Sequence, residues 1–153
     1  MKKTVVLMMT CLFISLTGFS QTIPAEKVPV NIKQAFEKKF PAAKDIKYEL
    51  ETREYEVSFK ENGVQMSANF DPAGKWLETE TQIKVSELPK EVTASVAKNY
   101  PGFKINAASR TETSTGGLSY ETDLQKDKVK HEVQFSPNGE VLKSKHLSKG
   151  SGG

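Results

Sequence analysis

Few residues in this chain of 153 have side chains and spacing suited to chemistry. His131 and His146 are its two histidines, and Cys11 is its single cysteine. A zinc-type site needs three or four His, Cys or carboxylate ligands, commonly at short spacings along the chain. Neither histidine has a second His or Cys at such a spacing. We therefore predict a packed or capped role for each histidine and no metal site.

Paired carboxylates could act as general acid and base if one of them had a raised pKa. The sequence holds two such pairs, Glu49 with Glu51 and Glu54 with Glu56. The alternation described below places all four on an open strand face, where water keeps carboxylates ionised, so we predict a solvated acidic surface. The sequence also holds no Gly-rich phosphate loop, nucleophile elbow or EF-hand loop. We predict no catalytic residue, no cofactor and no enzymatic activity.

The first twenty residues have the pattern of a secretory signal peptide. A basic start at Lys2-Lys3 precedes an apolar run over residues 5–16, and small residues lead to a cleavage position after Ser20. The apolar run is too short for a permanent bilayer anchor. We predict that residues 1–20 are removed, that no membrane span remains, and that the protein is periplasmic or secreted.

The composition suits one soluble globule, with 37% hydrophobic and 27% charged residues. The 22 basic residues barely exceed the 19 acidic ones, and two of the basic residues are in the leader, at Lys2 and Lys3. Nucleic-acid binding needs clustered basic residues without such compensation. We therefore predict no nucleic-acid partner.

Two short helices are predicted from apolar residues at helical spacing. Their apolar stripes are Ile32, Ala35, Phe36 and Phe40 in the first helix, and Val92, Val96 and Tyr100 in the second. Pro41 and Pro101 end the helices, because the residue before a proline disfavours the helical conformation. Helices of about three turns are unstable alone, so both must pack on other elements.

Apolar and polar residues alternate along the stretches after each helix, as in half-buried strands. The first half has four such stretches, at about 46–51, 54–60, 64–70 and 75–83, with turn signals at Asn62-Gly63 and Asp71-Pro72-Ala73-Gly74. The second half repeats the pattern with Leu118, Tyr120, Leu124, Val129, Val133 and Phe135 as its apolar set. A helix followed by a four-stranded antiparallel sheet, twice, predicts an α+β fold with both helices on one face.

The two halves match each other along their length. Val28-Pro29 matches Leu88-Pro89, and the turn at Phe70–Gly74 matches the turn at Phe135–Gly139. The second half carries a short insertion near Ser114-Thr115-Gly116-Gly117. We predict a tandem repeat, and its parts are a leader at 21–27, a first repeat at 28–83, a second repeat at 84–147 and a flexible tail at 148–153.

The alternation also assigns the face that lies away from the helices. We expect Ile46 and Leu77 to face the helices, as Leu142 would in the second half. Five residues of the first half are then candidates for partner binding on the open face: Trp76, Glu49, Glu56, Glu78 and Glu80. Trp76 is the aromatic anchor among them, unless it covers the seam with a neighbouring strand. The open face of the second half has mixed charge: Glu121, Asp123, Lys130, Glu132, Lys143 and Lys145.

Three features of this pattern resemble the PepSY-like, beta-lactamase-inhibitor-like domains of exported bacterial proteins. They are the helix ending in an aromatic-proline step, the strand beginning at Tyr55 or Tyr120, and the Phe-x-Pro-x-Gly turn before the last strand. The resemblance covers about residues 28–147. It implies a helix-plus-antiparallel-sheet fold with an open concave face, a setting in the periplasm or cell envelope, and a role in binding or inhibiting another protein.

We therefore predict an exported, non-catalytic binding module that docks or inhibits an envelope or extracytoplasmic protein through its open sheet face. The alternative is a small-molecule or cation binder that takes calcium on the acidic face.

Overall fold

The computed structural model describes residues 20–147. The predicted signal peptide up to residue 19 and the predicted tail at 148–153 lie outside the described residues. Within residues 20–147 the elements are β1 Ser20–Ile23, the 3-10 helix η1 Ala25–Lys27, α1 Val30–Lys39, β2 Lys44–Glu51, β3 Glu54–Glu61, β4 Val64–Phe70, β5 Trp76–Ile83, the 3-10 helix η2 Val85–Glu87, α2 Lys90–Asn99, β6 Lys104–Thr113, β7 Leu118–Lys126, β8 Val129–Phe135 and β9 Val141–Leu147.

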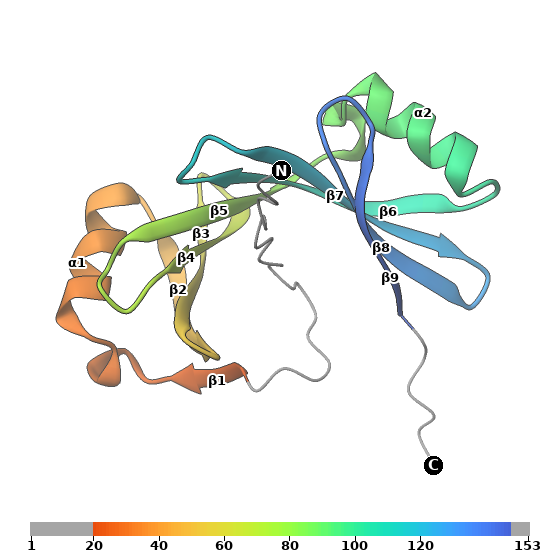
Figure 1. Cartoon of the computed structure of the whole chain (residues 1–153). Coiled ribbons are helices and arrows are strands. Elements are labelled where there is room, and N and C mark those ends of the chain that lie inside the picture. Colours follow the sequence, from red (N-terminus) through yellow and green to blue (C-terminus); the bar gives the residue numbers. More distant parts are fainter. Residues whose placement is uncertain (1–19, 148–153) are drawn as a thin grey trace, which may run out of the picture.

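The nine described strands form one antiparallel sheet in which each strand pairs with the next along the chain. β1 was not predicted, and it pairs with β2 from the segment that we expected to be a leader. β5 pairs with β6, so the strands that follow the two helices belong to one continuous sheet and not to two four-stranded sheets. Figure 1 shows this sheet bent into an arch, with α1 and α2 on its outer side. The predicted α+β class is confirmed.

Both helices begin after one proline and end before another. Pro29 and Pro89 are the N-cap residues of α1 and α2, where their fixed φ suits a helix start. The C-cap residues of the two helices are Phe40 and Tyr100, and each stands directly before a proline. The predicted limits of both helices are therefore confirmed.

Each helix packs its apolar stripe onto the strands that follow it. The cluster beneath α1 consists of Val28, Ile32, Phe36, Phe40, Tyr48, Val57, Phe59, Ala68 and Phe70. The cluster beneath α2 consists of Leu88, Val92, Val96, Ala108, Leu124, Val133 and Phe135. The rings of Phe36 and Phe59 meet edge to face with centroids 5.0 Å apart. The alternation predicted over residues 54–60 is confirmed, because it turns Val57 and Phe59 toward the helix and both side chains are fully buried.

A bulge at the start of β5 reverses one predicted side-chain direction. Phe70 of β4 pairs with Trp76, whereas the preceding Asn69 pairs with Glu78, so Leu77 is an extra residue. An extra residue breaks the alternation of a strand, so the residues on either side of it, here Trp76 and Glu78, point to opposite faces of the sheet. Trp76 therefore lies on the helix side of the sheet, and the prediction that Leu77 takes that place is wrong.

The last hairpin contains the same bulge. Phe135 of β8 pairs with Val141, and Leu142 is 37% exposed. The prediction that Leu142 faces the helix is therefore wrong for the same reason as that for Leu77. The two bulges lie at matching positions, just after the Pro-containing turns.

Three further apolar residues predicted to face a helix are exposed: Ile46 at 40%, Leu118 at 39% and Val129 at 39%. Ile46 lies in a register shift between Lys44 and Lys47, which breaks the alternation there. Leu118 and Val129 are the first residues of β7 and β8, at strand ends outside the core cluster.

Candidate functional site

The inner face of the arch, away from the helices, carries the predicted carboxylates. Glu49 of β2 lies directly opposite Glu56 of β3. Asn69 of β4 pairs with both Glu56 and Glu78, so these three side chains lie in one row across the sheet. Glu80 lies two residues beyond Glu78 on β5 and points to the same side. The structure therefore brings all four glutamates of the predicted site onto one face.

Trp76, the fifth predicted site residue, lies on the other face. Its Nε1 donates a hydrogen bond to Thr79 Oγ1 at 2.9 Å, and Lys39 Nζ of α1 lies 3.6 Å from the ring centroid. The indole also packs against the cluster beneath α1. The prediction that Trp76 shares a surface with Glu78 and Glu80 is wrong because of the β5 bulge.

The predicted solvated surface is wrong for Glu56, and two further glutamates of the same face, Glu78 and Glu80, are also buried. Glu56, Glu78 and Glu80 are only 5%, 6% and 2% exposed. Burial, together with the charges of Glu51 and Glu49, raises the pKa of Glu56 to about 7. Burial likewise raises the pKa of Glu80 to about 8. These carboxyl groups titrate near neutral pH and are not permanently ionised.

A cavity of about 330 Å³ opens on this face where the two halves of the sheet meet. It is lined by Gln65, Glu80, Gln82, Ala107, Ala108, Ser109, Glu121, Asp123 and Glu132. Burial, together with the charges of Glu80 and Glu132, raises the pKa of Glu121 to about 9. Burial also raises the pKa of Asp123 and of Glu132. The cavity is therefore a crowded carboxylate site that spans both halves.

Three cavity residues were absent from the predicted site. Alternation placed Glu121, Asp123 and Glu132 on the open face of the second half, which is where they lie. Their proximity to Glu80 depends on the pairing of β5 with β6, which joins the halves. No local pattern in the sequence reveals that pairing, because its two strands are separated by η2 and α2.

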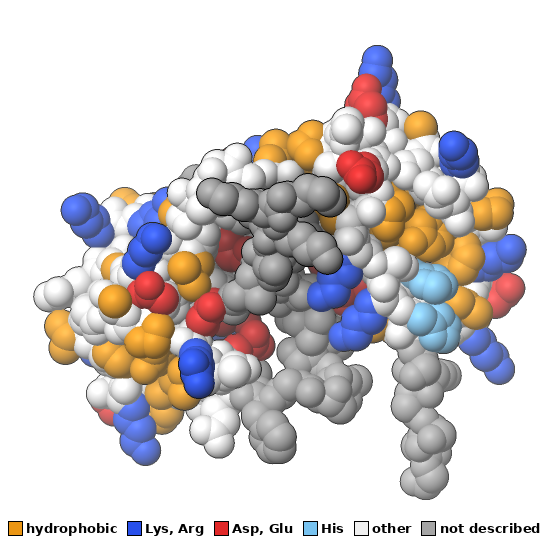
Figure 2. All heavy atoms as spheres, in the orientation of Figure 1, with side chains coloured by type: hydrophobic (Ala, Val, Ile, Leu, Met, Phe, Trp, Pro, Cys, Tyr) orange, Lys and Arg blue, Asp and Glu red, His pale blue; other side chains and the backbone are white. Residues whose placement is uncertain are grey.

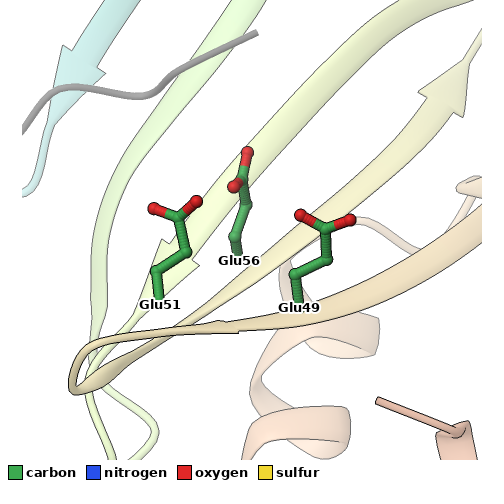
Figure 3. A group of neighbouring side chains, drawn as sticks. All are labelled: Glu49, Glu51 and Glu56. Carbon is green, nitrogen blue, oxygen red and sulfur yellow. The ribbon is translucent and has the colours of Figure 1, made fainter. Parts of the chain in front are cut away.

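A second acidic group lies nearer the β1 edge. Figure 3 shows Glu49, Glu51 and Glu56 with their carboxylates close together above β2 and β3. One carboxylate oxygen from each residue lies within 4.8 Å of the others. Oxygen ligands from several carboxylates suit a hard cation such as calcium.

The two histidines lie on the consecutive strands β8 and β9 and are neighbours in the structure. His131 of β8 lies directly opposite His146 of β9, and their ring centroids are 5.0 Å apart. The packed role predicted for His131 is confirmed, because its ring lies 5.7 Å from that of Tyr100 and 5.3 Å from that of Phe103. The spacing of the histidines along the chain did not reveal this cross-strand pair.

The chain matches the protein-family model described as "Putative beta-lactamase-inhibitor-like, PepSY-like" over residues 17–69 and again over residues 53–143. No curated protein matches it. Among residues 20–147, none of the helices has the length and apolar character needed to span a membrane.

Solved structures from Bacteroides species share the fold. A "putative periplasmic" protein from Bacteroides eggerthii is 21% identical, with a TM-score of 0.73 over 78% of this chain and 89% of that one. A DUF2874 family protein from Bacteroides uniformis is 20% identical, with a TM-score of 0.72 over the same shares. A BLIP-like protein from Bacteroides fragilis is 23% identical, with a TM-score of 0.65 over 79% of this chain and 87% of that one.

Proposed function

The chain belongs to the PepSY-like, beta-lactamase-inhibitor-like family, and from this premise we propose that it is an exported, non-catalytic binding module that docks a protein partner through its inner sheet face. Relatives described as periplasmic support a location in the periplasm or cell envelope. In this proposal residues 1–20 form a signal peptide that is cleaved after Ser20.

We also infer that the chain is a tandem repeat of one helix and four strands, with residues 28–83 and 84–147 as its two copies. Each copy has one α-helix followed by four strands, α1 with β2 to β5 and α2 with β6 to β9, and a 3-10 helix precedes each α-helix. Matching bulges after the Pro-containing turns support the same inference. A duplicated unit accounts for a binding face made from both copies.

The observation that carries the proposed function is the concentration of carboxylates on the inner face of the arch. In Figure 2 acidic side chains are visible in the left part of the space beneath the arch and basic side chains in its right part. The raised pKa of Glu56, Glu80 and Glu121, to about 7, 8 and 9, means that their ionised forms cost free energy in the protein alone. Cationic groups from a partner would offset that cost. We therefore propose a partner that presents Lys or Arg side chains to this face.

Capture of envelope proteins tests this function. The chain is immobilised and envelope extract is passed over it, with the retained proteins identified by mass spectrometry. The double variant Glu80→Gln, Glu121→Gln removes two cavity carboxyl groups that a cationic partner would hold in their ionised form, while it preserves side-chain size. We expect it to retain about tenfold less of the specific partner, because truncating a buried interfacial charge commonly costs 2 kcal/mol or more.

The matched control is Glu91→Gln, which removes an exposed carboxylate from α2 on the other side of the sheet. This control is expected to retain the partner at the level of the unmodified chain. Equal retention by the cavity variant and the control would show that the inner face is not the docking surface.

The acidic group of Glu49, Glu51 and Glu56 favours calcium binding as a second candidate function. Equilibrium dialysis with calcium, and with zinc for comparison, separates the two candidates. Tight binding of one calcium ion per chain that is lost when all three residues are changed to Gln would establish the cation binder. Weak binding that is unaffected by those changes would exclude it.

A further inference from the structure

The face of the sheet opposite the carboxylates carries a compact imidazole pair at its C-terminal edge. His131 and His146 lie on the helix side, because His131 also pairs with the buried Leu124 of β7. Figure 2 shows the two pale-blue histidines side by side on the flank of the molecule, next to apolar side chains. His131 is half-buried and His146 is exposed on the edge strand β9. The pair is thus open to solvent from one side.

The separation of the two rings matches that of two imidazoles on one metal ion. With a metal–nitrogen distance of about 2 Å, the metal lies about 3.2 Å from each ring centroid, so ligand angles between square-planar and tetrahedral place the centroids about 4.5 to 5.2 Å apart. The observed centroid distance is 5.0 Å, with the ring planes 62° apart. The backbone pairing of β8 with β9 holds both residues at this separation without an ion.

One atom of this pair has an unmet requirement. His131 Nδ1 is buried and has no hydrogen-bond partner in the structure. A buried polar atom without a partner is rare, and a bound ion or water is a common reason for it. The rings of Tyr100 and Phe103 hold His131 by packing, so its orientation does not depend on a hydrogen bond at Nδ1.

The surroundings restrict which ligand fits. Tyr100 donates a hydrogen bond from its hydroxyl to Ser144 Oγ at 3.0 Å, which places two further oxygen atoms beside the pair. Lys126 contacts the Phe103 ring that packs on His131. Its Nζ lies 6.0 Å from the Phe103 centroid and donates a hydrogen bond to Pro101 O. Imidazole nitrogen prefers Cu²⁺, Ni²⁺ and Zn²⁺ to calcium or magnesium.

We propose that His131 and His146 form an open binding site for a divalent late transition metal, with Cu²⁺ the tightest of the series. The two imidazoles supply neighbouring ligand positions, and the remaining positions are open to water or to a group from another molecule. The site lies on the opposite sheet face from the proposed docking surface, so either can exist without the other.

Titration of the full chain with Cu²⁺ alone tests the site, followed by electron paramagnetic resonance of the complex. We expect one Cu²⁺ per chain and hyperfine structure from two nitrogen ligands. His146→Ala, which changes an exposed residue, should raise the Kd at least about tenfold, since even indirect disturbance of a metal ligand costs that much. His131→Gln should do the same, and each variant should leave hyperfine structure from one nitrogen.

Lys145→Ala is the matched control, because it changes the neighbour of His146 on the same strand but on the other sheet face. It should bind Cu²⁺ as the unmodified chain does. Unchanged binding in His146→Ala, or a spectrum without nitrogen coupling, would overturn the proposal. Loss of binding only when Glu49, Glu51 and Glu56 are changed to Gln would also overturn it, because the ion would then lie on the acidic face.

Discussion

At the scale of single residues, the inner face is defined by carboxylates that are buried close to one another. Glu80 is 2% exposed, and the charges of Glu56 and Glu78 add to the effect of burial on its pKa. Such groups keep their protons at pH values where an exposed glutamate is ionised. The folded chain therefore binds more protons near neutral pH than the unfolded chain does.

The pH dependence of stability follows from these groups. The pKa of Glu56, Glu80 and Glu121 is raised to about 7, 8 and 9, so their stabilising contribution is complete below the unfolded pKa and is lost as pH rises through these values. We expect the free energy of unfolding in urea to fall by several kcal/mol between pH 5 and pH 9, with about 4 kcal/mol from Glu80 alone because its pKa is about 8. In Glu80→Gln, Glu121→Gln this decline should be much smaller. A free energy that rises over this range in the unmodified chain would contradict the burial of these groups.

Trp76 gives a second prediction at this scale. Because its ring lies between Lys39 of α1 and the core, Trp76→Ala should lower the free energy of unfolding by about 2–4 kcal/mol. Trp76→Phe keeps an aromatic ring and loses the bond to Thr79, so it should cost about 1 kcal/mol. Urea denaturation measures both. A Trp76→Ala variant with normal stability and abolished partner capture would instead support the docking role predicted from the sequence.

At the scale of elements, the Pro-containing turns before β5 and β9 contact the helices α1 and α2. Asn31 of α1 donates a side-chain hydrogen bond to Pro72 O at 3.0 Å. In the second half, Gly139 lies so close to Glu91 of α2 that a Cβ atom there would clash with the Glu91 backbone. These contacts position each helix along the strands, which helps to shape the arch that the inner face follows.

Two glycine variants test this contact. Gly139 and Gly63 have nearly the same positive φ, +83° and +80°, but a Cβ atom at Gly63 would meet nothing within 4 Å. Gly63→Ala should cost about 1 kcal/mol of stability from backbone strain alone. Gly139→Ala should cost about 3 kcal/mol, because the turn must also move away from α2. Equal losses in thermal or urea denaturation would show that the turn does not depend on its contact with the helix.

At the scale of the whole molecule, two apolar clusters share a single sheet. Each cluster lies between one helix and the sheet, and the pairing of β5 with β6 joins the strands that carry the two clusters. The carboxylate cavity lies over this junction, with Glu80 from β5 and Glu121 from β7. Neither half alone contains the complete inner face.

Unfolding in one step is the expected consequence. Separation of the halves would leave β5 and β6 with unpaired edges, which is unfavourable. Fluorescence of Trp76, the single tryptophan, reports on the first half, whereas circular dichroism reports on both. We expect the two signals to have the same urea midpoint, and Val96→Ala beneath α2 to lower both midpoints together. Separate midpoints would show that the halves unfold independently.

The sequence by itself determined the local elements, because each depends on neighbouring residues. Pro41 and Pro101 end the helices, Asn62-Gly63 forms a hairpin with positive φ at both residues, and alternation places Val57 and Phe59 beneath α1. The same alternation placed four of the five predicted site residues on the correct face. The aromatic-proline helix ends and the Phe-x-Pro-x-Gly turns carried the family resemblance, which the family model confirms.

The tertiary structure alone decided the features that depend on distant pairing. The direction of Trp76 depends on an extra residue in β5 that no period of two reveals. The cavity around Glu80 and Glu121 requires strands from both halves of the chain to lie side by side, and the approach of His131 to His146 depends on the register of the β8–β9 hairpin. Burial of the carboxylates follows from the curvature of one long sheet, which is a property of all nine strands together and not of any local run of residues.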